Sequence, residues 1–190
     1  MKIGLFFGSF NPIHIGHLII ANYMANYTDM DQVWLVVSPH NPLKNKNSLI
    51  NMYDRLEMVK IAIENADKIK ASDAEFKLPQ PSYTIDTLTY LKERYPEHQF
   101  TLIMGSDNLA SLKKWKNYEI LLRDYSITIY PRPGYENQEL ASHPSITITD
   151  TPQMEISSTF IRKAIQEGKN VQYFVPDEVL EFIDSKNLYR

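Results

Sequence analysis

Residues 8–17 read GSFNPIHIGH and join a predicted strand to a predicted helix. The residues before them, 2–7, form a short apolar run that is typical of a buried strand. From Ile15 to Tyr27, apolar side chains recur at a mixed spacing of three and four residues, which predicts a helix packed on the core. A helix that begins directly after a strand points its unpaired N–H groups and the positive end of its dipole at the turn. The turn is therefore a candidate site for an anion such as phosphate.

Two imidazoles stand at this predicted helix start. His14 and His17 are three residues apart and share a face on the first helical turn. Gly8, at the end of the strand, allows close approach of the backbone to a ligand, or a positive φ. Taken alone, the pair is an ordinary helix start with one imidazole bonded to a core carbonyl. In this turn it favours a nucleotide phosphate site over zinc, because no carboxylate lies between the histidines and the chain has no cysteine. The turn has neither a G-x-G-x-x-G nor a P-loop sequence.

Strands and helices are expected to alternate along the chain. Strands are predicted at 2–7, 32–38, 68–72, 100–105, 125–130 and 145–149. Helices are predicted at 15–27, 50–65, 84–94, 108–123 (as one or two), 160–167 and 177–186. This alternation predicts an α/β fold with a Rossmann-like, doubly wound parallel sheet and C-terminal helices, with ligands at the carboxyl ends of the strands where the winding reverses. Residues 131–144 are expected to form a long surface loop.

Composition excludes several classes of partner. At 190 residues, with 43% hydrophobic residues, the chain is expected to form a single domain over 1–190. A net charge of -3 offers no general attraction to nucleic acid, and the absence of cysteine excludes disulfides and fits a reducing cytoplasm. No segment approaches the roughly 18 apolar residues of a membrane span. We therefore expect a cytoplasmic protein without a nucleic-acid or membrane partner, and the oligomeric state stays open, a homo-oligomer included.

A second group of candidate binding residues lies at 156–163, which read ISSTFIRK. The hydroxyls of Ser157, Ser158 and Thr159 can cap a helix start and donate to a ligand oxygen, and Arg162 on the first turn presents a planar fork suited to phosphate. Serine and threonine before an amphipathic helix are also ordinary caps. This segment taken by itself therefore leaves both interpretations open.

Together the two segments resemble the bacterial nicotinate-nucleotide adenylyltransferase family, in the superfamily related to class I aminoacyl-tRNA synthetases. The family motif reads roughly GGTFDPIHxGH, and here Ser9 replaces the second glycine and Asn11 the aspartate, so that one negative charge near the phosphates is lost. The second signature, ISSTxIR, is matched without a substitution. The resemblance covers nearly the whole chain. It implies catalytic roles for His14, His17, Lys44 and Arg162, and ATP contacts for Gly8, Ser9, Phe10, Gly16, Ile156, Ser157 and Ser158.

Three further segments follow the family pattern. Residues 81–87, PSYTIDT, would otherwise be a capped helix start, and they resemble the segment that lies against the nicotinate, which makes Tyr83 and Thr84 candidate substrate contacts. The pattern GxDxLxxLxxW is met from Gly105 through Asp107 to Trp115. An aromatic residue spaced from leucines on a helix is more often core. By resemblance, Trp115 is expected to stack on the pyridine, and Asp107 is expected to hold the ribose or to position its neighbours. Lys44, in a polar loop, and Arg132 align with a family lysine and arginine.

The implied reaction is the transfer of the adenylyl group of ATP to nicotinate mononucleotide. A phosphate monoester attacks the α-phosphorus and expels pyrophosphate, so the protein must position the reactants and neutralise charge, without a general base. Mg²⁺ is expected to be carried on the ATP phosphates, since the sequence has no dedicated carboxylate cage for a metal.

Other functions use related sequences. Phosphopantetheine adenylyltransferases and CTP-dependent cytidylyltransferases share the fold and the histidine motif, but the PSYT segment and Trp115 argue against them. A nucleotide-binding regulatory module without turnover is also compatible with the fold. The presence of His14, His17, Lys44 and Arg162 argues against that alternative. The sequence does not decide between nicotinate and nicotinamide mononucleotide.

Overall fold

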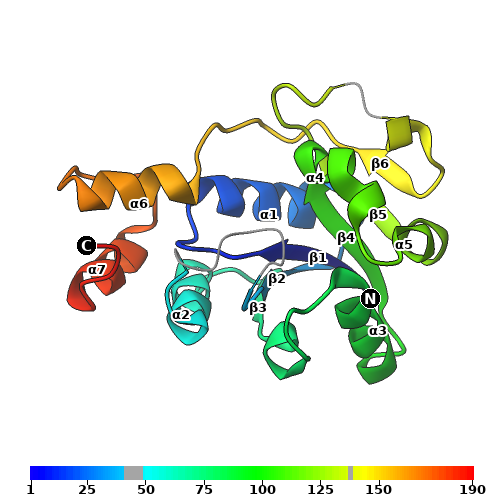
Figure 1. Cartoon of the computed structure of the whole chain (residues 1–190), viewed down its shortest axis with the longest axis horizontal. Coiled ribbons are helices and arrows are strands. Elements are labelled where there is room, and N and C mark those ends of the chain that lie inside the picture. The colour runs from blue at the N-terminus through cyan, green and yellow to red at the C-terminus, as the bar shows by residue number, and fades with distance from the viewer. Residues whose placement is uncertain (41–48, 137–138) are drawn as a thin grey trace.

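A parallel six-stranded sheet forms the centre of the molecule (Figure 1). The structure is a computed structural model that describes residues 1–40, 49–136 and 139–190. The strand order is β3-β2-β1-β4-β5-β6. The strands are β1 (Lys2–Gly8), β2 (Gln32–Val37), β3 (Ile69–Ser72), β4 (Gln99–Gly105), β5 (Ser126–Tyr130) and β6 (Ile146–Ile148). The predicted doubly wound α/β sheet is confirmed, since every neighbouring pair of strands is parallel.

Helices connect the strands and close the chain. The α-helices are α1 (Ile15–Tyr27), α2 (Met52–Ala62), α3 (Thr84–Arg94), α4 (Ser106–Ser111), α5 (Tyr118–Asp124), α6 (Ser158–Gln166) and α7 (Asp177–Ser185). Short 3₁₀ turns in the described residues are η2 (Ala74–Lys77), η3 (Leu112–Lys114) and η4 (Glu139–Ser142). The sequence pattern did not predict η2, and η4 lies inside the stretch expected to be loop. Both are single turns, too short for a hydrophobic period to develop.

Two hydrophobic cores lie on opposite faces of the sheet. Along β2, Val33, Leu35 and Val37 belong to the core with α1, α2, α6 and α7. Val36 belongs to the other core, which α3 and α5 cover. Since successive side chains of a strand point to opposite faces, this alternation places helices on both sides. Figure 1 shows α6 and α7 together at one end of the molecule, where Lys186 of the α7 C-cap pairs with Asp54 of α2 at 2.6 Å.

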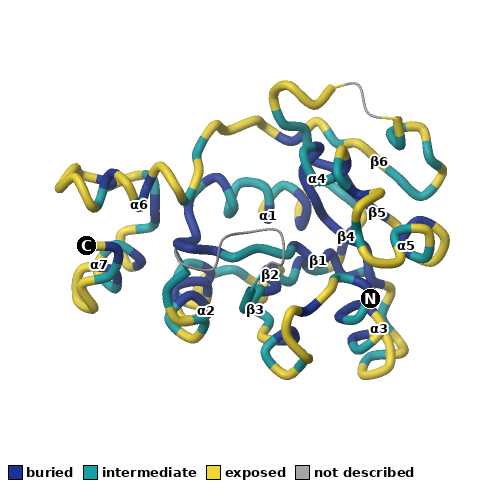
Figure 2. Tube along the Cα trace, viewed as in Figure 1, coloured by how far each residue is buried: buried dark blue, intermediate teal, exposed yellow. Residues whose placement is uncertain are grey.

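The order of the strands reverses between β1 and β4, which are neighbours at the centre of the sheet. The carboxyl ends of these two strands lead into the histidine turn and into α4. A crevice forms at such a reversal, because the connections leave in opposite directions. Residues 10–14 of the turn are buried (Figure 2). Among the described residues, no helix is long and apolar enough to cross a membrane.

Candidate active site

The two histidines lie against each other at the start of α1. His14 is the residue before the helix, with extended backbone, and His17 is on its first turn. Their ring centroids are 3.7 Å apart and the planes are nearly parallel. The backbone N–H of His14 donates to Nδ1 of His17 at 3.3 Å. An Nδ1 that accepts this bond places the proton of a neutral His17 on Nε2, so the donor N–H of this ring is on its far edge.

The His14 imidazole is held neutral. Burial, and to a smaller extent the nearby Arg132 guanidinium, lower the pKa of His14 to about 4. The side chain is only 5% exposed, and its Nδ1 has no hydrogen-bond partner among the described residues. At neutral pH this ring can therefore offer a single N–H donor but no full positive charge. The positive charge of the site must come from other groups.

The turn before the histidines is shaped by Phe10. Phe10 takes a positive φ of 45°, and its buried ring packs edge-on against His17 with centroids 5.1 Å apart. A Cβ on Gly8 would lie 2.7 Å from the Phe10 ring. Of the two roles expected of Gly8, it does not take a positive φ, since the positive-φ glycines among the described residues are Gly134 and Gly168. Because Gly8 has no side chain, the Phe10 ring fits next to it and packs against His17.

The start of α6 lies beside this turn. Ser157 caps the helix, since its Oγ accepts the N–H of Phe160 at 3.2 Å. The Ser158 hydroxyl donates to the carbonyl of Pro12 at 2.9 Å, and Nη1 of Arg162 donates to the carbonyl of Asn11 at 2.8 Å. These two bonds join segments about 150 residues apart in the sequence and fix the N-terminus of α6 next to the histidines.

The opposite wall comes from the other half of the sheet. Tyr83 and Thr84 stand at the start of α3, and Trp115 follows η3. Trp115 Nε1 is buried without an acceptor among the described residues. Asp107, on the first turn of α4, lies 3.4 Å from Nε of Arg132. This wall therefore combines flat aromatic surface with a carboxylate and a guanidinium.

These walls enclose one cavity of about 900 Å³. Of the predicted site residues, those lining it are Gly8, Ser9, Phe10, His14, His17, Tyr83, Thr84, Asp107, Trp115, Arg132, Ile156, Ser157, Ser158 and Arg162. Gly16 instead lines an adjoining cavity of about 380 Å³, which shares His14 and His17 with the first. Gly105 lines neither cavity, but a Cβ there would meet the Asp107 carboxylate and lie 3.1 Å from the ring of Tyr130, two residues that line both. Lys44 lies outside the described residues.

Comparison with known proteins agrees with this arrangement. Residues 5–164 match the cytidylyltransferase-like family model. A probable nicotinate-nucleotide adenylyltransferase of Flavobacterium johnsoniae is 59% identical, with 100% of both chains covered. A relative of the same description from Cytophaga hutchinsonii is 53% identical, over 100% of this chain and 98% of the relative. The chain belongs to the nicotinate-nucleotide adenylyltransferase family. Its class is therefore that of the nucleotidyltransferases.

Solved structures support the fold. The Plasmodium falciparum nicotinic acid mononucleotide adenylyltransferase complexed with NaAD superposes with a TM-score of 0.84 and 24% identity, covering 99% of this chain and 97% of that one. A Vibrio parahaemolyticus protein described as a putative nicotinate-nucleotide adenylyltransferase gives 0.75, also at 24% identity. At this identity the likeness is one of fold.

Asn11 is the departure from the family motif that the structure explains. Asn11 lines the large cavity, and its side-chain oxygen accepts the Tyr189 hydroxyl at 3.0 Å and the N–H of Ile50 at 3.4 Å. Asn11 is 3% exposed. An amide in place of a carboxylate therefore avoids burying a charge at this point.

The sequence did not indicate a structural role for Arg55 at the site. It is 1% exposed and donates to the carbonyls of Ser9, Ser38, Pro39 and Ile50, at 2.7 to 3.2 Å. Burial lowers its pKa. The guanidinium thus ties the turn after β1 to the loop after β2 and to the start of α2. In the sequence, Arg55 is one charged residue in a helix that contains both apolar and charged residues. An exposed arginine would give the same sequence pattern, so the pattern does not reveal its burial.

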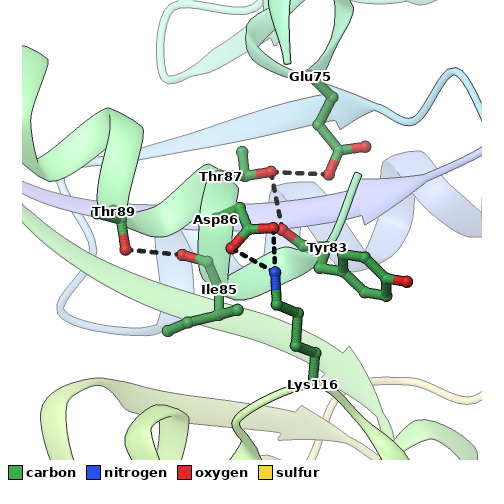
Figure 3. Close-up of polar contacts among 7 residues, drawn as sticks. All are labelled: Glu75, Tyr83, Ile85, Asp86, Thr87, Thr89 and Lys116. Atoms are coloured by element: carbon green, nitrogen blue, oxygen red, sulfur yellow. Dashed lines mark hydrogen bonds and ion pairs between the residues drawn. The ribbon is translucent and has the colours of Figure 1, made fainter. Parts of the chain in front are cut away.

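Glu75 of η2 was also missed. Its carboxyl group is 3% exposed, lines the large cavity, and accepts the Thr87 hydroxyl at 3.0 Å (Figure 3). Burial raises the pKa of Glu75, against the hydrogen bonds that lower it. Among the residues that the structure describes, no group of three or more acidic, histidine or cysteine side chains could hold a metal ion. The carboxylates of the site therefore stand apart.

Proposed function

We propose that this protein transfers the adenylyl group of ATP to nicotinate mononucleotide, which yields deamido-NAD (nicotinate adenine dinucleotide) and pyrophosphate in NAD biosynthesis. The observation that carries the proposal is the single cavity in which His14, His17 and Arg162 face a wall with Tyr83 and Trp115. It offers phosphate-binding donors and an aromatic surface for a pyridine ring within one space. The relatives' description supports the same substrates.

The two cavities suggest how the substrates divide the site. The smaller one is lined by Tyr135, Gln153 and Met154, which do not line the larger one, and we assign it to the adenine end of ATP. The larger one has room for the mononucleotide beside Trp115. The shared wall of His14 and His17 then places the α-phosphate between the two nucleosides.

The proposed chemistry is an in-line displacement. A phosphate oxygen of the mononucleotide forms a bond to the α-phosphorus, the bond from that phosphorus to the bridging oxygen breaks, and pyrophosphate leaves with the electron pair. His14 and His17 donate N–H groups to the α-phosphate oxygens, while Arg162 carries the full positive charge near the departing phosphates. Lys44 is proposed as a further cation on the family resemblance. We assign Gly8, Ser9, Ser157 and Ser158 to ATP contact and Asp107 to the ribose.

Mg²⁺ is the proposed cofactor. The described residues offer no cage of three ligands, which fits a Mg²⁺ ion held by the triphosphate and water. The bound ion would neutralise charge on the β- and γ-phosphates. The protein's own part is then to hold the triphosphate through the N-terminus of α6 and Arg162. A cytoplasmic location and the oligomeric state remain predictions from the sequence.

The deciding experiment measures pyrophosphate release by the purified protein with ATP and Mg²⁺. Nicotinate mononucleotide and nicotinamide mononucleotide are compared as acceptors, with phosphopantetheine as a third. We expect turnover with the first to exceed that with the other two. Absence of pyrophosphate release with any mononucleotide would contradict the proposal and favour a regulatory module.

A second test concerns the aromatic wall. Trp115→Ala is expected to raise KM for the mononucleotide about tenfold or more while KM for ATP changes less than about twofold, because a lost ring stack costs ~1–3 kcal/mol. Steady-state kinetics with each substrate varied in turn gives both constants. Equal effects on the two would show that Trp115 supports the fold and does not contact the acceptor.

A further inference from the structure

Lys116 lies in the wall of the cavity that Tyr83 and Trp115 form, and no sequence motif indicated it as a functional residue. It follows Trp115 directly, in the turn between η3 and α5, and lines the same cavity as Trp115, Tyr83 and Thr84. Its side chain is 43% exposed, so the ammonium is in contact with solvent and can move. The residue thus brings a positive charge to the end of the site where the proposed function places the pyridine ring.

The ammonium has a defined place in the structure. Nζ lies 2.9 Å and 3.1 Å from the two carboxylate oxygens of Asp86, on the first turn of α3 (Figure 3). It also lies 4.7 Å from the centre of the Tyr83 ring. An ion pair between half-exposed groups is weak, so the ammonium can exchange one carboxylate for another at little cost. The start of α3 is also a favourable place for Asp86 whether or not the lysine is bound.

The surroundings favour an anion over a neutral group at this point. The first N–H groups of α3, next to Tyr83, form the positive end of its helix dipole. Glu75 reaches the same cavity from η2, and its carboxyl group accepts the Thr87 hydroxyl at 3.0 Å. Nicotinate mononucleotide differs from nicotinamide mononucleotide by a carboxylate in place of an amide. A mobile cation beside a helix N-terminus distinguishes these two groups, while an aromatic stack does not.

We propose that Lys116 is a specificity-determining residue that selects the carboxylate of nicotinate mononucleotide against the amide of nicotinamide mononucleotide. In the structure Asp86 holds the ammonium over Tyr83. When the acceptor enters, the ammonium shifts part of its interaction from Asp86 to the substrate carboxylate. This inference rests on the proposed function, because it needs the pyridine ring at the Trp115 wall.

The test compares kcat/KM for the two mononucleotides in Lys116→Met. The ratio of nicotinate to nicotinamide mononucleotide is expected to fall about five- to tenfold, the scale of one partly screened charge interaction. The loss is expected almost entirely in KM for nicotinate mononucleotide, with the nicotinamide substrate changed less than about twofold. Activity toward nicotinamide mononucleotide then also reports that the variant is folded. Lys116→Arg keeps the charge and is expected to restore most of the ratio.

The matched control is Lys113→Met. Lys113 is three residues away, similarly exposed, and pairs with Glu139 at 2.6 Å outside this cavity. The Lys113→Met variant removes the same charge and should leave the ratio of kcat/KM for the two mononucleotides unchanged. Equal losses for both mononucleotides in Lys116→Met, an unchanged ratio, or the same fall in Lys113→Met would each overturn the proposal. Absence of activity in the unmodified protein would instead contradict the proposed function.

Asp86→Asn tests the exchange between carboxylates. Without Asp86 the ammonium has no competing partner, and the negative charge next to the substrate carboxylate is gone. The ratio is therefore expected to rise about two- to threefold above that of the unmodified protein. The double variant Lys116→Met with Asp86→Asn should show a smaller effect of the aspartate change, because its partner is absent. An unchanged or lower ratio in Asp86→Asn would overturn the exchange.

Discussion

At the scale of single residues, the proposed chemistry depends on His17. Its ring lies on the first turn of α1 with Nδ1 bonded to the N–H of His14, which leaves Nε2–H as the donor. His17→Ala should lower kcat about 10²- to 10³-fold, as expected when one preorganised donor to a developing oxyanion is removed. The change in melting temperature should be small, because the ring is half-buried and not part of either core. Pyrophosphate release and circular dichroism check both parts, and full activity in the variant would contradict the assignment.

The burial of His14 predicts how the free energy of unfolding depends on pH. Its folded-state pKa is about 4, below the ordinary 6.5, so between these values the unfolded chain binds the proton and the folded protein does not. The stabilisation from this group is complete above pH 6.5 and is lost as the pH falls toward 4. At pH 5 the loss amounts to about 2 kcal/mol. Urea unfolding at pH 7.5 and at pH 5 should therefore show a smaller acid effect in His14→Gln than in the unmodified protein. Equal acid effects in both would show that His14 is not buried as a neutral ring.

At the scale of elements, Arg55 of α2 holds the loops around the site. Its guanidinium satisfies four carbonyls from three segments, and no neighbouring group could replace all of these bonds. Arg55→Met should lower the free energy of unfolding by about 3–5 kcal/mol, because buried carbonyls lose their donors. It should also raise KM for ATP, since Ser9 loses its support. Arg55→Lys keeps the positive charge but lacks the planar set of N–H donors, and it is expected to recover only part of the lost free energy of unfolding. Urea unfolding and ATP kinetics measure both effects.

At the scale of the whole molecule, the C-terminus supports the N-terminal turn. The hydroxyl of Tyr189 donates to the side-chain oxygen of Asn11, 178 residues earlier. Tyr189→Phe should lower the free energy of unfolding by about 1 kcal/mol and reduce kcat a few-fold, because the turn that carries the histidines loses one anchor. Tyr173→Phe is the control, because that side chain is 80% exposed. Thermal unfolding and kcat give the comparison, and identical results for the two variants would contradict the anchoring role.

The sequence alone was enough for the fold and for much of the site. The hydrophobic periods predicted all six strands and the order of the α-helices, because burial on one or two faces leaves a repeat that can be read along the chain. The motifs around His14, Ser157 and Trp115 are contiguous, so a resemblance could place them. Short pieces without a period, such as η2 and η4, could not be predicted.

Only the tertiary structure decided the contacts between distant segments. Arg55, Glu75, Asn11 with Tyr189, and Lys116 with Asp86 each depend on residues that meet because the sheet places them at one edge. A buried arginine and an exposed one are the same letter in a sequence, and the protonation of His14 follows from desolvation that exists only in the folded chain. Local patterns therefore determined which elements form and which motifs they carry. Packing determined which ionisable groups are buried, which charges are paired, and which side chains line the cavity.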